Sequence, residues 1–178
     1  MLKTFSLKHD VEHQTLLPLL TAYLNVLNVL LQDIWEAITW RERKLPNKNQ
    51  KRLLPKIRGD NAFKRYLRNK NLQHWEYAKH WVDSALKTAY SIIKSWEKNY
   101  RKGKRKRNCP QVRRTFARVK QTLMKLEGDR LRITIKPREF AYIDLSKRFF
   151  KLKGTLGEPI HPNPHPHPPP NPHPHPTA

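Results

Sequence analysis

The chain has 178 residues, the length of one ordinary domain or of one domain with an attached tail. Its 37 Lys and Arg outnumber its 14 Asp and Glu, which gives a net charge of +23 at pH 7, larger than solubility requires and typical of proteins that bind nucleic acid. The single cysteine, Cys109, excludes an internal disulfide and any cysteine-based zinc site closed within the chain.

The sequence does not favour a membrane protein. The N-terminus lacks the apolar core of a signal peptide. The most apolar run, residues 16–31, is interrupted by Pro18 and Asn25 and is shorter than the roughly 20 residues of a bilayer span. Basic residues are interleaved with core-forming segments, whereas a membrane-surface helix gathers them on one face. We therefore expect a cytoplasmic protein with no membrane partner.

The first elements are a strand and a long helix. Residues 2–8 alternate apolar and polar side chains, which predicts a half-buried strand that pairs with strands after residue 113. Residues 12–41 predict a helix, with its regular part beginning near Thr15. Its apolar stripe steps by three or four residues: Leu16, Leu20, Tyr23, Leu27, Leu30, Ile34 and Ile38. Trp35 is interpreted as a core residue; Trp40 is either a core residue or a platform for base stacking.

A basic segment and two more helices follow. Between residues 41 and 70 there are twelve Lys and Arg against two acidic residues. Pro46 and Pro55 prevent a continuous helix here, so the segment is either a solvated loop or part of a polyanion-binding surface. Residues 59–61 predict a turn and helix cap before a short amphipathic helix, whose apolar face is Ala62, Phe63, Tyr66 and Leu67. Residues 72–100 show a clear helical period, in which the small residues Ala78, Ala85 and Ala89 allow close approach. We expect this helix to pack nearly antiparallel to the first.

Residues 98–120 form a basic joint with eleven Lys and Arg and no acidic residue. Like charges at this density require a polyanion or open water beside them, so phosphate backbone is the expected partner. The candidate nucleic-acid-binding residues are Arg101, Lys102, Lys104, Arg105, Lys106, Arg107, Arg113, Arg114, Arg118 and Lys120.

Strand patterns come after the joint. Residues 115–126 are predicted to be extended, with a possible break near Gln121. Gly128 lies in the turn to residues 131–135, where apolar and polar residues alternate. With residues 140–145 these segments predict an antiparallel meander. The sequence thus predicts an α+β fold: two long antiparallel helices and a short one, inserted in a small antiparallel sheet or barrel made by the N-terminal strand and the meander. The expected divisions are residues 1–10 (first strand), 11–100 (helical layer), 101–113 (basic joint), 114–153 (meander) and 154–178 (tail).

Residues 154–178 hold ten of the fifteen prolines and five of the nine histidines. This composition predicts a disordered, extended tail without a core. His-rich tracts can bind borderline metals, so the candidate ligands for Ni or Zn are His165, His167, His173 and His175. A low-complexity segment without function is the other interpretation, and no cofactor is required by any other feature.

The order of these parts resembles the N-terminal part of the TnpB (OrfB) proteins, transposon-encoded relatives of compact RNA-guided nucleases. The resemblance rests on KTFSLK, a Leu-rich helix, the basic run YRKGKRKRNCPQVRRTF and the segment LMKLEGDRLRITIKPREFAYIDLSKRFFKLKG, and it covers residues 2–157. It implies a helical recognition layer and a wedge barrel that together hold a guide RNA and its DNA target, with base pairing reading the sequence. The family's nuclease domain and zinc ribbon would follow near residue 158, and no Asp or Glu occurs after Glu158.

The first hypothesis is therefore a nucleic-acid-binding protein, truncated relative to the TnpB pattern and without cleavage activity of its own. The alternative is a metal-handling or scaffold protein that uses the His/Pro-rich tail, with the basic body as its anchor. An enzyme is the least favoured class, because the sequence shows no phosphate-binding glycine loop and no nucleophile with a placed base. The oligomeric state is not predicted.

Overall fold

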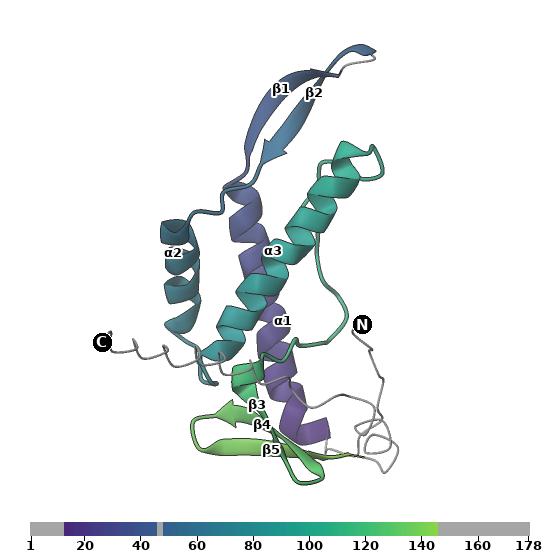
Figure 1. The fold of residues 1–178 in the computed structure, drawn as a ribbon. Helices are drawn as coiled ribbons and strands as arrows, with labels where there is room; N and C mark the ends of the chain where they lie inside the picture. The colour runs from purple at the N-terminus through teal and green to yellow at the C-terminus, as the bar shows by residue number, and fades with distance from the viewer. Residues whose placement is uncertain (1–12, 46–47, 146–178) are drawn as a thin grey trace, which may run out of the picture. The chain divides into compact units, whose positions relative to one another are not determined.

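The computed structural model describes residues 13–45 and 48–145 (Figure 1). Residues up to Asp144 belong to one compact unit. The N-terminal strand predicted at residues 2–8 and the His/Pro-rich tail lie outside the described residues. Within these ranges the fold is α+β, as predicted, with three helices and two small antiparallel sheets.

The first helix, α1 (His13–Glu36), carries the predicted apolar stripe. Its buried residues are Leu19, Tyr23, Leu27, Leu30, Leu31 and Ile34, so Leu19 replaces the predicted Leu20 in the core. The helix ends five residues before the predicted residue 41. Trp40 packs edge to face on Trp35 with ring centroids 5.7 Å apart, whereas a continuing helix would turn residues five positions apart to different faces.

A β-hairpin replaces the loop expected after the first helix. Strand β1 (Thr39–Leu45) pairs antiparallel with β2 (Lys48–Lys56), in a register that runs from Thr39 opposite Lys56 to Lys44 opposite Lys51. Pro55 is compatible with β2 because every strand of a two-stranded sheet is an edge strand, where a missing N–H is tolerated. The absence of a helix was predicted correctly, whereas the solvated loop was wrong, because the prolines and charges of these residues gave no strand pattern.

Helix α2 (Asn61–Leu72) begins at the predicted cap. The Asp60 side chain accepts a hydrogen bond of 2.8 Å from the backbone N–H of Phe63, which satisfies one of the free donors of the first turn. This bond, followed by the Arg58 side chain, lowers the pKa of the Asp60 carboxyl. Phe63 and Leu67 are buried as predicted, but Tyr66, placed on the same apolar face, is exposed.

Helix α3 (His80–Arg101) starts eight residues later than predicted. The N–H of Ala78 donates to Ile135 O of the β-meander at 2.9 Å, so it cannot join a helical ladder. The Trp81 indole N–H also donates into the sheet, to Thr134 O at 2.9 Å. The start of α3 is therefore fixed by the sheet.

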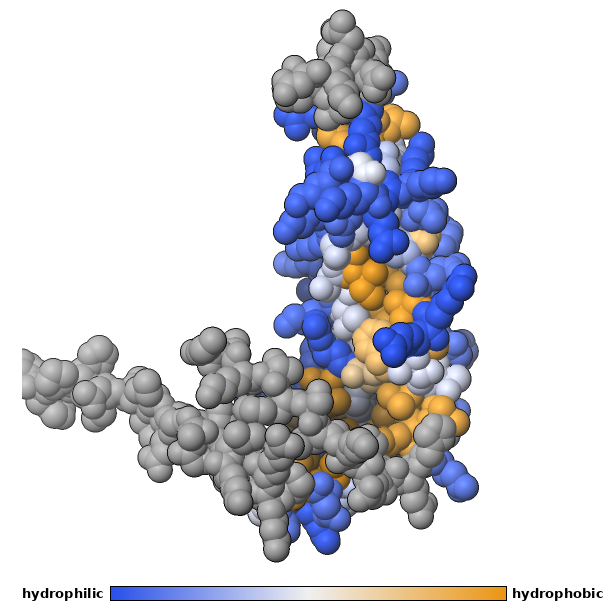
Figure 2. Space-filling model, turned by 90° about the vertical axis from the view of Figure 1, so that its right-hand side faces the viewer, coloured by the Kyte–Doolittle hydropathy of each residue, from blue (hydrophilic) through white to orange (hydrophobic). Residues whose placement is uncertain are grey.

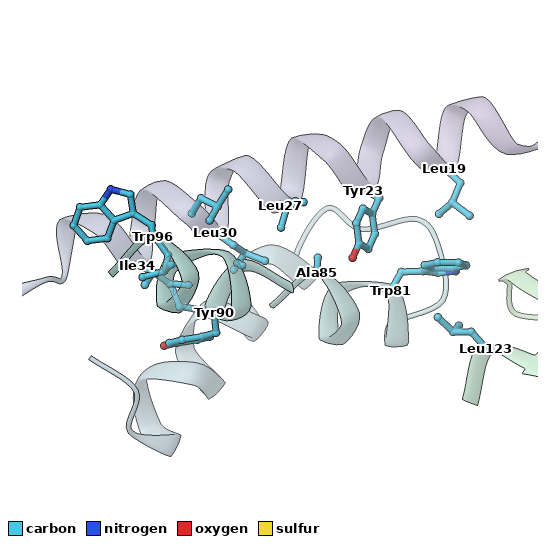
Figure 3. Packing of buried hydrophobic residues seen from close by; sticks show 14 of the residues in the cluster. Leu19, Tyr23, Leu27, Leu30, Ile34, Trp81, Ala85, Tyr90, Trp96 and Leu123 are labelled. Carbon is cyan, nitrogen blue, oxygen red and sulfur yellow. The ribbon is translucent and has the colours of Figure 1, made fainter. Parts of the chain in front are cut away.

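Helices α1 and α3 run parallel, not antiparallel as predicted. Near their N-terminal ends Tyr23 lies edge to face with Trp81, and near their C-terminal ends Trp35 lies edge to face with Trp96. Figure 3 shows the same order, with Leu19 beside Trp81 at one end of the cluster. The reason is topological: the hairpin and α2 together return the chain to the end where α1 began (Figure 1).

The buried face of α3 includes the predicted small residues Ala85 and Ala89, which allow α1 to approach closely. Two polar side chains, those of Ser84 and Thr88, are buried with them. Thr88 donates its hydroxyl proton to Ser84 O at 2.8 Å, so its oxygen is the acceptor for Tyr23 OH at 3.2 Å. The polar groups in this core are thus satisfied.

The meander forms the second sheet, as predicted. Strands β3 (Met124–Glu127), β4 (Arg130–Lys136) and β5 (Glu139–Asp144) are antiparallel in that order. Gly128 supplies the positive φ of 59° in the first turn and Arg138 one of 67° in the second. The possible break near Gln121 is a short 3-10 helix, Gln121–Leu123, and strand β3 follows it. The residues before the break belong to no strand.

One segment of the described residues, Leu16–Glu36, is long and apolar enough to cross a membrane by length and composition. We expected the apolar run in this region to be shorter than a bilayer span, and this expectation about its length was wrong. Core helices of soluble proteins pass the same test, and one face of α1 is buried against α3.

Candidate nucleic-acid interface

The predicted basic joint is a long irregular segment, residues 104–120, called the strap below. Helix α3 ends at Arg101, and Gly103 turns the chain with a φ of 78°. The N–H of Gly103 donates to Tyr100 O and that of Lys104 to Asn99 O, each at 2.9 Å, which is how helices commonly end at a glycine. The strap then returns along α1 and α3 to the sheet (Figure 1).

Side chains from the helices hold the strap by its backbone. Asn28 of α1 donates to Val112 O and accepts from Val112 N–H, both at 2.9 Å. The Trp96 indole donates to Lys106 O at 3.2 Å, and the Ser84 hydroxyl donates to Arg118 O. At Lys106, Val112 and Arg118 these three side chains take the place of the neighbouring strand with which backbone groups pair in a sheet. The strap therefore has a defined path although it belongs to no sheet.

The strap faces the core with apolar side chains and solvent with basic ones. Val112, Ala117 and Val119 pack against the core. Nine of the ten predicted binding residues are exposed, and Lys120 is half-buried. Figure 2, which views the side along which the strap runs, shows hydrophilic residues covering most of the upper part of that face. The structure therefore presents the predicted charges on a fixed support.

Cys109, also in the strap, is half-buried and its thiol points at Leu31 O, 3.7 Å away. Burial, followed by the negative charge of Glu36, raises the pKa of this thiol. A neutral, packed thiol is a poor nucleophile, so Cys109 is a structural residue of the strap.

A groove of about 1040 Å³ runs beside α3, and sequence reasoning missed most of its residues. Its walls come from the hairpin, from α2, from α3 and from the end of the strap. Its basic residues are Arg41, Arg43, Lys56, Lys64, Lys87, Lys94, Arg101 and Lys120; only the last two were predicted. The density of basic residues between residues 41 and 70 pointed to this surface in the sequence. Nothing in the sequence around Lys87 and Lys94 distinguishes them from other exposed lysines of a helix.

Three acidic residues also line the groove: Glu42, Asp83 and Glu97. Glu97 pairs with Arg101 at 2.7 Å, and Asp83 pairs with Arg68 at 2.5 Å and with His80 at 3.2 Å. Burial by itself would raise the pKa of Asp83, but the hydrogen bond and charge of Arg68, with His80 and Lys120, outweigh it and lower the pKa. Eight cations against three anions leave the groove strongly positive.

A second groove, of about 830 Å³, lies between α3 and the strap. It is lined by Arg105 and Arg113 of the strap and by Ser95 and Asn99 of α3. The two grooves use different faces of α3, so basic residues flank this helix on both sides.

An aromatic cluster joins the strap to the hairpin. Trp40 lies within 6.1 Å of Trp96 and 5.8 Å of Tyr100 between ring centroids. The Arg107 guanidinium sits over the Trp40 ring, 4.1 Å from its centroid. Trp40 is therefore half-buried, and the Arg107 guanidinium covers one face of its ring. Of the two interpretations of Trp40, core residue or base-stacking platform, this packing favours the core residue.

The described residues contain no group of three or more His, Cys, Asp or Glu that could hold a metal ion. The candidate metal ligands His165, His167, His173 and His175 lie outside the described residues. The metal-handling alternative remains a prediction.

Comparisons with known proteins match one family model and two relatives. A family model described as the Uncharacterized protein MJ0013 family matches residues 19–134. The chain is 44% identical over 149 residues to Uncharacterized protein MJ0013 of Methanocaldococcus jannaschii, covering 76% of this chain and 90% of that protein. It is 41% identical over 142 residues to TnpB-like protein MJ1635 of the same organism, covering 76% of this chain but only 32% of that protein. No solved structure matches.

Proposed function

The chain belongs to the MJ0013 family and is related to a TnpB-like protein; from this premise we propose that it binds nucleic acid. The strap and the positive groove beside α3 are the surfaces that hold phosphate backbone. Phosphate contacts by Lys and Arg supply most of the sequence-independent affinity of such proteins.

One observation carries the proposal: the strap is fixed by its backbone while its cations are left in solvent. Asn28, Ser84 and Trp96 hold the strap at three points along its length. A basic loop that served only solubility would need no such support. A backbone that is already held in place loses less conformational entropy when a phosphate chain binds its side chains, and this makes binding tighter.

The similarity to the TnpB-like protein also supports a more detailed proposal. In this proposal the described residues correspond to the N-terminal wedge and recognition part of TnpB-like proteins. The aligned 142 residues occupy 32% of the TnpB-like relative, and a long helix, a helix that ends in a basic segment and a β-meander occur in the described residues in the order of the TnpB pattern. The nucleic acid would then be a structured guide-like RNA, its DNA target, or both. No cleavage chemistry is assigned to the described residues, and the half-buried, unpaired thiol of Cys109 suits a reducing, cytoplasmic setting.

A salt series tests the proposal. The full chain is titrated with a structured RNA and with a DNA duplex of about 20 base pairs between roughly 50 and 300 mM salt. We expect the logarithm of the binding constant to fall linearly with the logarithm of salt concentration, with a slope of about −0.9 per phosphate contacted on duplex DNA. No binding at low salt, or binding independent of salt, would refute the proposal.

The triple variant Lys104→Gln, Arg105→Gln, Lys106→Gln assigns the effect to the strap. It leaves Arg107 on Trp40, so the aromatic cluster stays intact. We expect at least a tenfold loss of affinity at low salt and a slope shallower by up to about 2.7. The matched control removes three charges from the meander, with Lys125→Gln, Arg130→Gln and Arg138→Gln; an equal loss in the control would show that only net charge matters.

A further inference from the structure

The two grooves that flank α3 differ in chemistry. The groove beside α3 is lined by eight Lys and Arg and three acidic residues, and the described residues of its walls include no Asn or Gln. The groove between α3 and the strap has two arginines, Arg105 and Arg113, and three side-chain amides, those of Asn99, Asn108 and Gln111; the described residues that line it include no Asp or Glu. The first groove suits phosphate, whereas the second also offers a ligand amide donors and acceptors.

The strap wall of this second groove is fixed on both sides of the amides. Before them, the Trp96 indole donates to Lys106 O at 3.2 Å. After them, Asn28 exchanges two hydrogen bonds of 2.9 Å with the backbone of Val112. Between these points the Cys109 thiol lies 3.7 Å from Leu31 O. The groove is therefore formed without a ligand, so a ligand that enters it orders little of the chain.

The fold itself makes little use of the polar side chains in this groove. Asn99 donates from Nδ2 to Ser95 O at 2.9 Å, which orients the amide, and its Oδ1 accepts no hydrogen bond from the described residues. Asn108 and Gln111 are exposed, and in the part of the chain that the structure describes their amides have no hydrogen-bond partner. These groups are thus available to a ligand.

Apolar and polar surfaces meet in the same groove. Ile92, Trp96 and Pro110 line it together with the amides. Its volume of about 830 Å³ lies within the range of about 300 to 1,000 Å³ that is usual for small-molecule sites. A nucleobase has the matching combination, since its faces are apolar and its edge carries hydrogen-bond donors and acceptors.

We propose that the groove between α3 and the strap holds an unpaired base of a nucleic-acid strand, an inference that rests on the proposed nucleic-acid binding. The amides of Asn108 and Gln111 bind the edge of the base, and adenine suits them because its N6 donor and N7 acceptor match the two groups of an amide. Arg105 and Arg113, one before and one after these amides in the strap, take the phosphates on either side.

The base must lie outside a duplex. In a duplex the base faces are covered by stacking and the pairing edge is occupied, so a side-chain groove of this kind cannot enclose the base until it leaves the stack. Bulges, loops and single strands present bases in that state. The groove therefore adds a preference for unpaired nucleotides to the charge-driven binding of the strap.

A single-adenine bulge tests the proposal on the full chain. The probe is a 20-base-pair duplex in three forms: fully paired, with one bulged adenosine, and with an abasic residue in the bulge. The abasic form keeps the backbone and its charge, so the affinity ratio of the adenine bulge to the abasic bulge reports the base alone. We expect a ratio of at least five. The probes are made in RNA and in DNA, and the larger ratio identifies which of the two supplies the base.

The variant Asn108→Ala, Gln111→Ala removes two amides and no charge. We expect its ratio to fall below two, while its affinity for the fully paired duplex and the dependence of that affinity on salt stay unchanged. Its melting temperature should also stay unchanged, because both side chains are exposed. The matched control, Asn69→Ala, Gln73→Ala, removes two exposed amides at the end of α2 and should keep the full ratio.

The outcomes separate this inference from the proposed function. Equal binding of the adenine and abasic bulges, in RNA and in DNA alike, would overturn the base site and leave nucleic-acid binding in place. An undiminished ratio in the Asn108→Ala, Gln111→Ala variant would also overturn it, because the base would then bind elsewhere. Absence of binding to any nucleic acid would overturn both.

Discussion

The strap and the hairpin are both rich in Lys and Arg, but different contacts hold them in place. The strap contains no strand, yet Asn28, Ser84 and Trp96 hold its backbone along the helices. The hairpin has a full ladder between its strands, yet helix α3 holds it only near its base, through Arg52 and Tyr100. Regular secondary structure therefore does not mark the better fixed of the two basic segments.

The difference follows from where each segment's hydrogen bonds go. Backbone groups of the strap at Lys106, Val112 and Arg118 pair with side chains of the helices, so the strap cannot leave the helices without breaking these bonds. Most of the hairpin's backbone bonds join its two strands to each other, so its outer part can open while the helices stay packed.

The largest expected effect is that of Trp96→Ala, because Trp96 contacts both segments. Its ring is buried, packs edge to face against Trp35 and against Trp40 of the hairpin and stacks on Tyr100, and its indole N–H donates to Lys106 O. We expect the free energy of unfolding to fall by about 3 to 5 kcal/mol, measured by urea denaturation. Trp96→Phe should cost much less; equal losses would show that the ring contacts contribute little.

Asn28→Leu should release the strap alone. It leaves both the N–H and the C=O of Val112 without their partner, which we expect to cost about 1 to 3 kcal/mol. Hydrogen exchange should quicken in the strap and stay unchanged in the hairpin. Asn25→Leu, an exposed position on the same helix, is the control and should change stability by less than about 0.5 kcal/mol.

Tyr100→Phe should release the hairpin alone. The variant loses the hydrogen bond to Leu53 O but keeps the ring, so we expect about 0.5 to 1.5 kcal/mol of destabilisation. Exchange of the β1 and β2 amides should quicken while the Val112 amide keeps its protection. Equal quickening in both segments would contradict the separation described above.

Asp83→Asn tests the end of the strap, where Lys120 acts on Asp83. The pKa of Asp83 in the folded chain lies below its ordinary 3.8, so ionised Asp83 stabilises the fold above about pH 4, and this contribution is lost as the pH falls through the folded value. The carboxyl is partly in solvent, so we expect less than about 1 kcal/mol at pH 7. The difference between wild type and variant should shrink as the pH falls below 3.8; a difference that stays constant with pH would contradict it.

The sequence predicted the helices and the meander because their apolar residues repeat at clear periods. It also predicted the cap at Asp60, the turn at Gly128 and the charge of the strap. It did not predict the orientation of α1 and α3, because helical period carries no direction. That orientation depends on how many times the chain reverses between them, and the hairpin supplies one of those reversals.

The hairpin itself was hidden because its strands lack apolar alternation. Residues such as Arg41 and Arg43 occupy positions where a half-buried strand would have apolar side chains. The groove beside α3 was hidden for another reason: Lys64, Lys87 and Lys120 come from three separate segments, and only the packing of α2, α3 and the strap brings them together.

Helix α3 connects the two ends of the described fold as a rigid rod. It has 22 residues and is therefore about 33 Å long. At one end Trp81 is bonded to strand β4, and at the other Arg52 of the hairpin is bonded to the last carbonyls of the helix. The helix therefore keeps the hairpin and the meander a fixed distance apart, and the two cannot approach each other unless α3 bends or one of these attachments breaks.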